Sequence, residues 1–183
     1  MFIQIIVLAL VIGIIFKGSL RNLSNFKLQG IYFVIAAFLL EAVVIMTVRK
    51  GIIQIGIVTL LSDIVMYSLL IVFVYKNRRE PLIYIVGIGF LLNAVAIFAN
   101  GGTMPVALNA VHAAGLTENV GTMGLYKLVG TDTKFWFLGD IIPYTFLNKN
   151  ILSVGDLILS LGIMLIIIKG MCTKNIEKYK GLD

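Results

Sequence analysis

Two aspartates, Asp140 and Asp156, stand in an almost wholly apolar stretch of the chain, FWFLGDIIPYTFLNKNILSVGDLILSLG (Phe135–Gly162). Two carboxyl groups brought close together do not both ionise easily, so one of them keeps its proton. Such a pair can act as general acid and general base, because one carboxyl donates a proton while the other activates water. If the fold brings Asp140 and Asp156 together, the pair predicts an aspartate-dyad hydrolase.

The residues next to the two aspartates fit a site of this kind. A glycine precedes each acid, Gly139 and Gly155, and leaves the backbone open to close approach by a ligand or another chain segment. Ser153 lies three residues before Asp156, so on a helix its hydroxyl shares a face with the carboxylate and can bond it.

A further polar element is NAVAIFANGGTMPVALNAVH, in which Asn93 and Asn100 are seven residues apart and share one helix face. Gly101–Gly102 suit a left-handed helix end, and Pro105 suits the first turn of a short helix at 106–115. The functional interpretation places these groups beside the aspartates, whereas the structural alternative is a helix–turn–helix corner at the membrane surface. The predicted ligand-binding residues are Asn93, Asn100, Gly101, Gly102 and Ser153.

Two more acids, Glu41 and Asp63, stand inside apolar runs. A charged side chain in lipid costs several kcal/mol, so we expect both acids to face the interior of a helix bundle. A satisfied structural carboxylate is the main interpretation of each, and an ion pathway through both stays open. His112 is interpreted as an interfacial polar residue, and Trp136 as part of an aromatic belt.

The composition indicates a membrane protein. Of the 183 residues, 60% are hydrophobic and only 13% are charged, about half the charged share of a soluble domain. The net charge of +6 comes from short basic clusters between apolar runs, a pattern that sets membrane topology, so we expect no nucleic-acid partner. One cysteine, Cys172, and one histidine exclude an intramolecular disulfide and a Cys- or His-based metal centre. We therefore predict no metal and no cofactor.

Five apolar segments, each about as long as a bilayer is thick, predict an all-α fold of one domain. This fold is an integral membrane bundle of five transmembrane helices. The predicted spans are residues 1–16, 30–48, 52–75, 82–99 and 151–168. The outer loop, residues 100–150, is expected to hold the short interfacial helix and a re-entrant segment at 135–147, which Pro143 interrupts. Residues 169–183 form the predicted cytosolic tail.

The basic residues orient this bundle. With the N-terminus outside, ten of the fifteen Lys and Arg residues fall on inner segments and five on outer ones. The positive-inside rule then predicts a membrane protein with its N-terminus outside and its C-terminus inside. Asp140 and Asp156 lie at the outer face in this topology. The lipid bilayer is the expected partner, and the oligomeric state is left open.

Three motifs, NGGTMP (Asn100–Pro105), LGDIIP (Leu138–Pro143) and SVGD (Ser153–Asp156), resemble a bacterial family of small membrane proteins of unknown function. The resemblance covers nearly the whole chain and implies no activity. In that family a histidine often precedes the Leu-Gly-Asp motif, and the nearest match in this chain is Tyr126.

A local resemblance links FLGDII and NILSVGDLILSLG to the aspartate motifs of lipoprotein signal peptidase, the type II enzyme. It implies that Asp140 and Asp156 are catalytic and act on a lipid-linked or transmembrane peptide. The chain departs from that family at Ser153, where an asparagine is expected, and at Gly155, where an alanine is expected. It also lacks the Asn-x-x-Asp-Arg box and has five predicted spans rather than four.

Three hypotheses follow from the sequence. The first is a membrane protein whose polar outer site binds or passes a ligand, and a polar path joining Glu41 and Asp63 to that site would favour it. The second is the aspartate-dyad hydrolase, which requires the two carboxyl groups to reach one substrate. The third is a structural or partner subunit, which Asp156 bonded only to backbone amides would favour.

Overall fold

The computed structural model describes residues 2–116, 124–146 and 148–173 of the chain. Long helices dominate this part of the protein. They are α1 (Phe2–Ile15), α3 (Ile31–Arg49), α4 (Ile57–Lys76), α5 (Ile83–Ala99) and α7 (Val154–Cys172). Within the described residues, α3, α4 and α7 are long and apolar enough to cross a membrane, while α1 and α5 are shorter apolar helices. Large apolar side chains cover their outward faces, as at Leu39 and Leu91, each 61% exposed. Such a surface is typical of a membrane protein.

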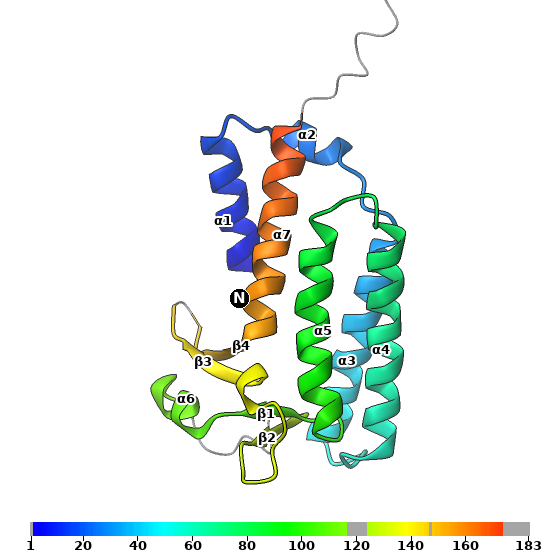
Figure 1. Cartoon of the computed structure of the whole chain (residues 1–183), viewed down its shortest axis with the longest axis vertical. Coiled ribbons are helices and arrows are strands. Elements are labelled where there is room, and N and C mark those ends of the chain that lie inside the picture. Colours follow the sequence, from blue (N-terminus) through cyan, green and yellow to red (C-terminus); the bar gives the residue numbers. More distant parts are fainter. Residues whose placement is uncertain (1, 117–123, 147, 174–183) are drawn as a thin grey trace, which may run out of the picture.

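The helices run alternately up and down, so their connections gather at two ends (Figure 1). One end, which we call the basic end, holds the short helix α2 (Leu20–Asn25), the α4–α5 loop and the last turn of α7. The opposite end, the cap end, holds the segment between α5 and α7. The basic end takes its name from Lys17, Arg21, Lys27, Lys76, Arg78, Arg79 and Lys169.

The cap end contains a four-stranded sheet, so the all-α prediction is wrong there. Its strands are β1 (Met104–Val106), β2 (Tyr126–Leu128), β3 (Asp140–Tyr144) and β4 (Asn150–Ser153), in the order β2-β1-β3-β4. β1 is parallel to β2 and β3, and β3 is antiparallel to β4. The sheet, with the helix α6 (Leu108–Ala113) beside it, forms the cap. The short helix expected within 106–115 is α6.

The segment predicted to be re-entrant, 135–147, is instead a 3₁₀ turn (Trp136–Leu138) followed by β3. Pro143 does not interrupt a helix, because it lies in the strand opposite Ile151 of β4. β1 pairs with β3 only at Val106 and Asp140, so β3 beyond Asp140 has a free edge, where proline is tolerated. The chain turns back through an antiparallel strand pair rather than through a broken helix.

Glycines let α5 and α7 pack at close range. A Cβ added to Gly89 of α5 would lie 2.7 Å from the Leu159 backbone nitrogen and 2.8 Å from the Gly155 carbonyl oxygen of α7. A Cβ added to Gly162 would lie 2.9 Å from the Val86 backbone nitrogen. Small residues at such contacts are the usual means by which membrane helices approach each other. We call this contact the glycine seam, and it runs from the cap end toward the basic end.

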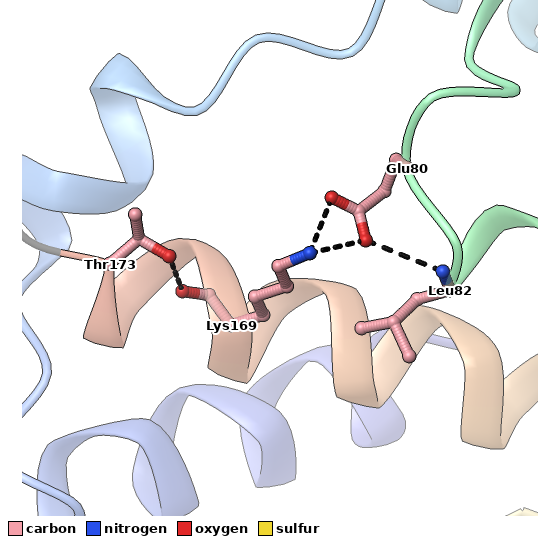
Figure 2. Close-up of polar contacts among 4 residues, drawn as sticks. All are labelled: Glu80, Leu82, Lys169 and Thr173. Carbon is pink, nitrogen blue, oxygen red and sulfur yellow. Dashed lines mark hydrogen bonds and ion pairs between the residues drawn. The ribbon is translucent and has the colours of Figure 1, made fainter.

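An ion pair fastens α7 to the α4–α5 loop at the basic end (Figure 2). The Lys169 Nζ atom lies 2.6 and 2.7 Å from the two carboxylate oxygens of Glu80, and the Leu82 backbone N–H donates to the same carboxylate at 3.3 Å. The Thr173 hydroxyl donates to the Lys169 carbonyl oxygen at 2.8 Å. Every oxygen of the Glu80 carboxylate therefore has a donor.

Asn77 joins the chain before α3 to the end of α4. Its side chain is 6% exposed, and its oxygen accepts from the Gln29 backbone N–H at 2.8 Å. Its amide donates to the Gln29 and Phe73 carbonyl oxygens, both at 2.8 Å. A buried amide with all these bonds is a satisfied structural group.

Candidate functional site

A cavity of about 260 Å³ lies where the bundle meets the cap, and we call it the acid cavity. Its wall comes from α3, α4, α5 and α7 and from all four strands of the sheet. The polar side chains of the wall are Glu41, Asp63, Tyr67, Asn93, Tyr126, Asp140, Asn150 and Asp156. None of the described residues that line it is a lysine, arginine or histidine. The prediction that Glu41 and Asp63 face the bundle interior is confirmed.

Asp63 of α4 holds the least satisfied polar atom of the wall. The residue is only 4% exposed, and its Oδ2 atom has no hydrogen-bond partner among the residues that the structure describes. Gly102 lies against this oxygen, with a left-handed φ of 84° that favours glycine. A Cβ added to Gly102 would lie 3.2 Å from Oδ2. The carboxylate therefore retains an unused acceptor at the cavity wall.

Asp156 is held at the first turn of α7 by a capping box. Its backbone N–H donates to the Ser153 hydroxyl oxygen at 2.9 Å, and its carboxylate accepts from the Ser153 backbone N–H at 3.2 Å. This reciprocal pair fixes the start of the helix directly after β4. Asn93 of α5 donates from Nδ2 to the other Asp156 oxygen at 3.0 Å and accepts from the Ser153 hydroxyl at 2.8 Å. Both oxygens of Asp156 thus have a donor.

Asp140 begins β3, between β1 and β4, and is 8% exposed. Burial raises the pKa of its carboxyl group well above the usual range, and the negative charge of Asp156 raises it further. Burial likewise raises the pKa of the Tyr126 hydroxyl, with contributions from the negative charges of Asp140, Glu41 and Asp156, while Arg49 opposes the shift. Burial and the neighbouring acids therefore favour the protonated forms of Asp140 and Tyr126, in which each group can donate a hydrogen bond.

The predicted site residues divide into two groups. Asp140, Asp156, Asn93 and Gly102 line the acid cavity, and Ser153 bonds two of them. Asn100 and Gly101 do not line it.

Asn100 is committed elsewhere, which explains its absence from the wall. Its Nδ2 atom donates to the Ala96 and Lys134 carbonyl oxygens at 2.7 and 2.8 Å, and its Oδ1 atom accepts from the Lys134 backbone N–H at 3.0 Å. Asn100 therefore ties the end of α5 to the loop before β3. Trp136, 52% exposed, contacts the Phe137 ring edge-on, outside the cavity wall.

The cavity also includes residues that sequence reasoning did not assign to the site. Tyr126 of β2 and Asn150 of β4 reach the wall through the sheet, whose pairing joins distant segments. The sequence predicts that Glu41 and Asp63 are buried acids and leaves open whether a polar path joins them to the site. The signal that points to them is the preference of intramembrane acids for a bundle interior. Within residues 2–116, 124–146 and 148–173, no group of three or more His, Cys, Asp or Glu residues is placed to hold a metal ion.

Comparison with known proteins places the chain in a family without an assigned activity. The model of a family of unknown function, DUF5317, matches residues 25–168. A Thermotoga maritima protein described as uncharacterized is 23% identical over 169 residues, which cover 90% of this chain and 89% of that protein. No solved structure matches the chain. The family match covers more than half of the sequence, so the chain belongs to this family of unknown function.

Proposed function

We propose that this member of the DUF5317 family is an integral membrane protein that binds or passes a small, positively charged ligand in the acid cavity. In this proposal all five long helices span the bacterial cytoplasmic membrane, the N-terminus lies outside, and the cap faces the outer side. The lipid bilayer and the small ligand are its proposed partners.

The observation that supports this function is the gathering of four carboxyl groups, Glu41, Asp63, Asp140 and Asp156, on one wall that has no basic side chain among its described residues. A buried carboxylate is costly unless a positive charge or hydrogen-bond donors compensate it. A cationic ligand would supply that compensation, and an anionic one would add to the repulsion. The cavity volume of about 260 Å³ lies just below the roughly 300–1,000 Å³ of pockets for drug-sized ligands, so the ligand is small.

The arrangement of basic residues supports the proposed orientation. The two loops between α1 and α3 and between α4 and α5, together with the end of α7, bring their lysines and arginines to the same end of the bundle. Basic residues concentrate on the cytoplasmic side of membrane proteins. Cys172 lies at this end and is exposed, so an impermeant maleimide should label it only after the inner face is opened. As a control, Asp132→Cys in a Cys172→Ser chain should be labelled in intact cells.

A panel of small compounds tests the ligand. Matched ammonium, neutral and carboxylate compounds would be added to the purified protein in lipid nanodiscs, and the unfolding temperature would be measured. We expect only ammonium compounds to raise it, and Glu41→Gln combined with Asp63→Asn to abolish the rise. Asp132, an exposed acid outside the wall, supplies the control variant Asp132→Asn. Equal stabilisation by the carboxylate compounds would refute the proposal.

A second candidate function is the aspartate-dyad hydrolase, acting on a lipid-linked or membrane peptide. Its support is that Asp140 and Asp156 line the same cavity and that the charge of Asp156 helps to raise the pKa of Asp140. Asp140 would then donate the proton and Asp156 would activate water. Against this role, both Asp156 oxygens already accept hydrogen bonds, from Asn93 and from the Ser153 backbone.

The hydrolase hypothesis predicts that Asp140→Asn and Asp156→Asn each abolish peptide cleavage, because the catalytic proton is shared between the two carboxyl groups. Cleavage of a fluorogenic lipopeptide by the nanodisc protein would be measured, with Asp132→Asn as the control. Cleavage that survives in either amide variant would exclude the dyad.

A further inference from the structure

The carboxylates of the acid cavity differ in how many of their oxygens have a hydrogen-bond donor. Asp156 has a donor at each oxygen, whereas Asp63, only 4% exposed, keeps Oδ2 without a partner among the residues that the structure describes. This free acceptor is a second observation, independent of the clustering of acids, that points to a bound group. A buried acceptor without a donor costs roughly 1–3 kcal/mol, more when it is charged, so an incoming donor is favoured at this atom.

We propose that the ligand is an amine with an apolar body, whose protonated nitrogen donates a hydrogen bond to Oδ2 of Asp63. This inference rests on the proposed function and narrows its ligand from cations in general to those that carry an N–H group. A quaternary ammonium ion has the charge but no proton to donate, and an alcohol has the donor but no charge.

The space around Asp63 supports this geometry. Gly102 stands against Oδ2, where an added Cβ would lie 3.2 Å from the oxygen, so it offers no side-chain donor. Thr59, one turn before Asp63, uses its hydroxyl on the Gly56 carbonyl oxygen at 2.8 Å, so it is engaged within the first turn of α4. Neither neighbour therefore supplies the donor that this buried oxygen lacks.

Apolar side chains of the wall near α4 support the second half of the proposal. Met66 and Leu70 follow Asp63 at one-turn intervals, and Phe90 of α5 and Phe38 of α3 complete this side. Aromatic faces attract a cation, and methionine and leucine cover an apolar chain. Because the cavity volume is only about 260 Å³, the body of the amine is a single ring or a short chain.

Three compounds of nearly equal shape test the inference: phenethylamine, phenethyl alcohol and trimethyl(phenethyl)ammonium. Binding to the nanodisc protein would be measured by isothermal titration at neutral pH. We expect phenethylamine to bind at least tenfold more tightly than either analogue. Asp63→Asn keeps the shape but removes the charge, and it should lower the affinity for phenethylamine at least tenfold. Asp132→Asn should leave that affinity unchanged.

The possible results distinguish a failure of this inference from a failure of the proposed cation-binding function. Equal binding of phenethylamine and its trimethylated analogue, both above the alcohol, would overturn the hydrogen bond to Asp63 and leave a cation-binding cavity. Unchanged amine affinity in Asp63→Asn would overturn it in the same way. If phenethylamine bound no better than the alcohol, both the inference and the cation proposal would fail. The comparison in the unaltered protein holds even if Asp63→Asn does not fold.

Discussion

The two ends of the helix bundle differ in how completely their polar groups are paired. At the basic end, Glu80 has a donor at each oxygen and Asn77 uses both ends of its amide, so these polar groups are paired within the protein. At the cap end, several acids share one cavity without a lining base among the described residues, and Asp63 keeps an unpartnered oxygen. The polar groups of the basic end hold the helices together, whereas the cap end keeps a hydrogen-bond acceptor that a ligand can use.

This difference gives a physical criterion for a site. A buried polar group that is fully bonded contributes to the fold, and removing it costs stability. A buried polar group that lacks a hydrogen-bond partner lowers stability, and proteins keep such groups where a ligand supplies the missing partner. Substitutions at the two ends should therefore differ in sign as well as in size.

The largest effect on stability should come from a substitution in the glycine seam, because this contact between α5 and α7 runs from the cap end toward the basic end. Gly89→Leu would push its side chain into the α7 backbone, where even a Cβ meets the Leu159 nitrogen at 2.7 Å. Overpacking costs up to about 3 kcal/mol, and backbone contact places this case at the upper limit. Thermal unfolding in detergent would measure it. Gly130→Ala is the control, since a Cβ there meets nothing within 4 Å.

Asn77→Ala should have the next largest effect and should act at the basic end alone. It removes three hydrogen bonds and leaves the Gln29 backbone groups without partners, for a loss of about 2 kcal/mol. Asn25→Ala, at an exposed position, should change little. The unfolding temperature should fall while ligand binding in the acid cavity stays intact. A loss of binding equal to that of Asp63→Asn would mean that the two ends are not independent.

Glu80→Gln should cost less, about 1 kcal/mol, because the Lys169 side chain is 41% exposed and water screens the pair. The loss should shrink at high salt, since screening already weakens the pair there. A double-mutant cycle with Lys169→Met would isolate the ion pair from the remaining contacts. A coupling energy of zero would show that the pair contributes nothing to fastening α7.

Asp63→Asn should have the smallest effect on stability, a change of no more than about 0.5 kcal/mol, because no hydrogen bond to Oδ2 is lost and a buried charge is removed. Its effect on ligand binding should nevertheless be the largest of the four. A loss of 2 kcal/mol or more, as large as that of Asn77→Ala, would assign Asp63 to the fold and remove the contrast between the two ends. Unfolding and binding would be measured on the same preparation.

The sequence predicts the long helices but not the strands of the cap. Long apolar runs predict α3, α4 and α7 because length and composition alone decide whether a helix can cross a membrane. The strands of the cap are three to five residues long, and β1 pairs with residues 22 and 34 positions later in the chain, Met104 with Tyr126 and Val106 with Asp140. No local pattern encodes such pairing.

The same distinction explains the site. The spacing links Ser153 to Asp156, but the bonds differ from the expected one: the Ser153 hydroxyl accepts from the Asp156 backbone N–H and donates to Asn93, while the Asp156 carboxylate accepts from the Ser153 backbone N–H. Asn100 lies outside the wall of the acid cavity and bonds Lys134, 34 residues away, a pairing that no local pattern reveals. Glu41 and Asp63 were expected inside the bundle from the cost of exposing an acid to lipid, but that cost does not say which other acids they meet.

The direct junction of β4 with α7 has a consequence for biosynthesis. β4 ends at Ser153 and α7 begins at Val154, so no linker separates the cap from the last helix. The ribosome delivers α3, α4 and α5 first, carrying Glu41 and Asp63, and domains form in the order in which their segments emerge. Asp156 and the final strand arrive only with α7. The wall of the cavity is therefore completed only when α7 emerges, and a chain released before α7 would carry Glu41 and Asp63 without Asp156 and Leu159 of that wall.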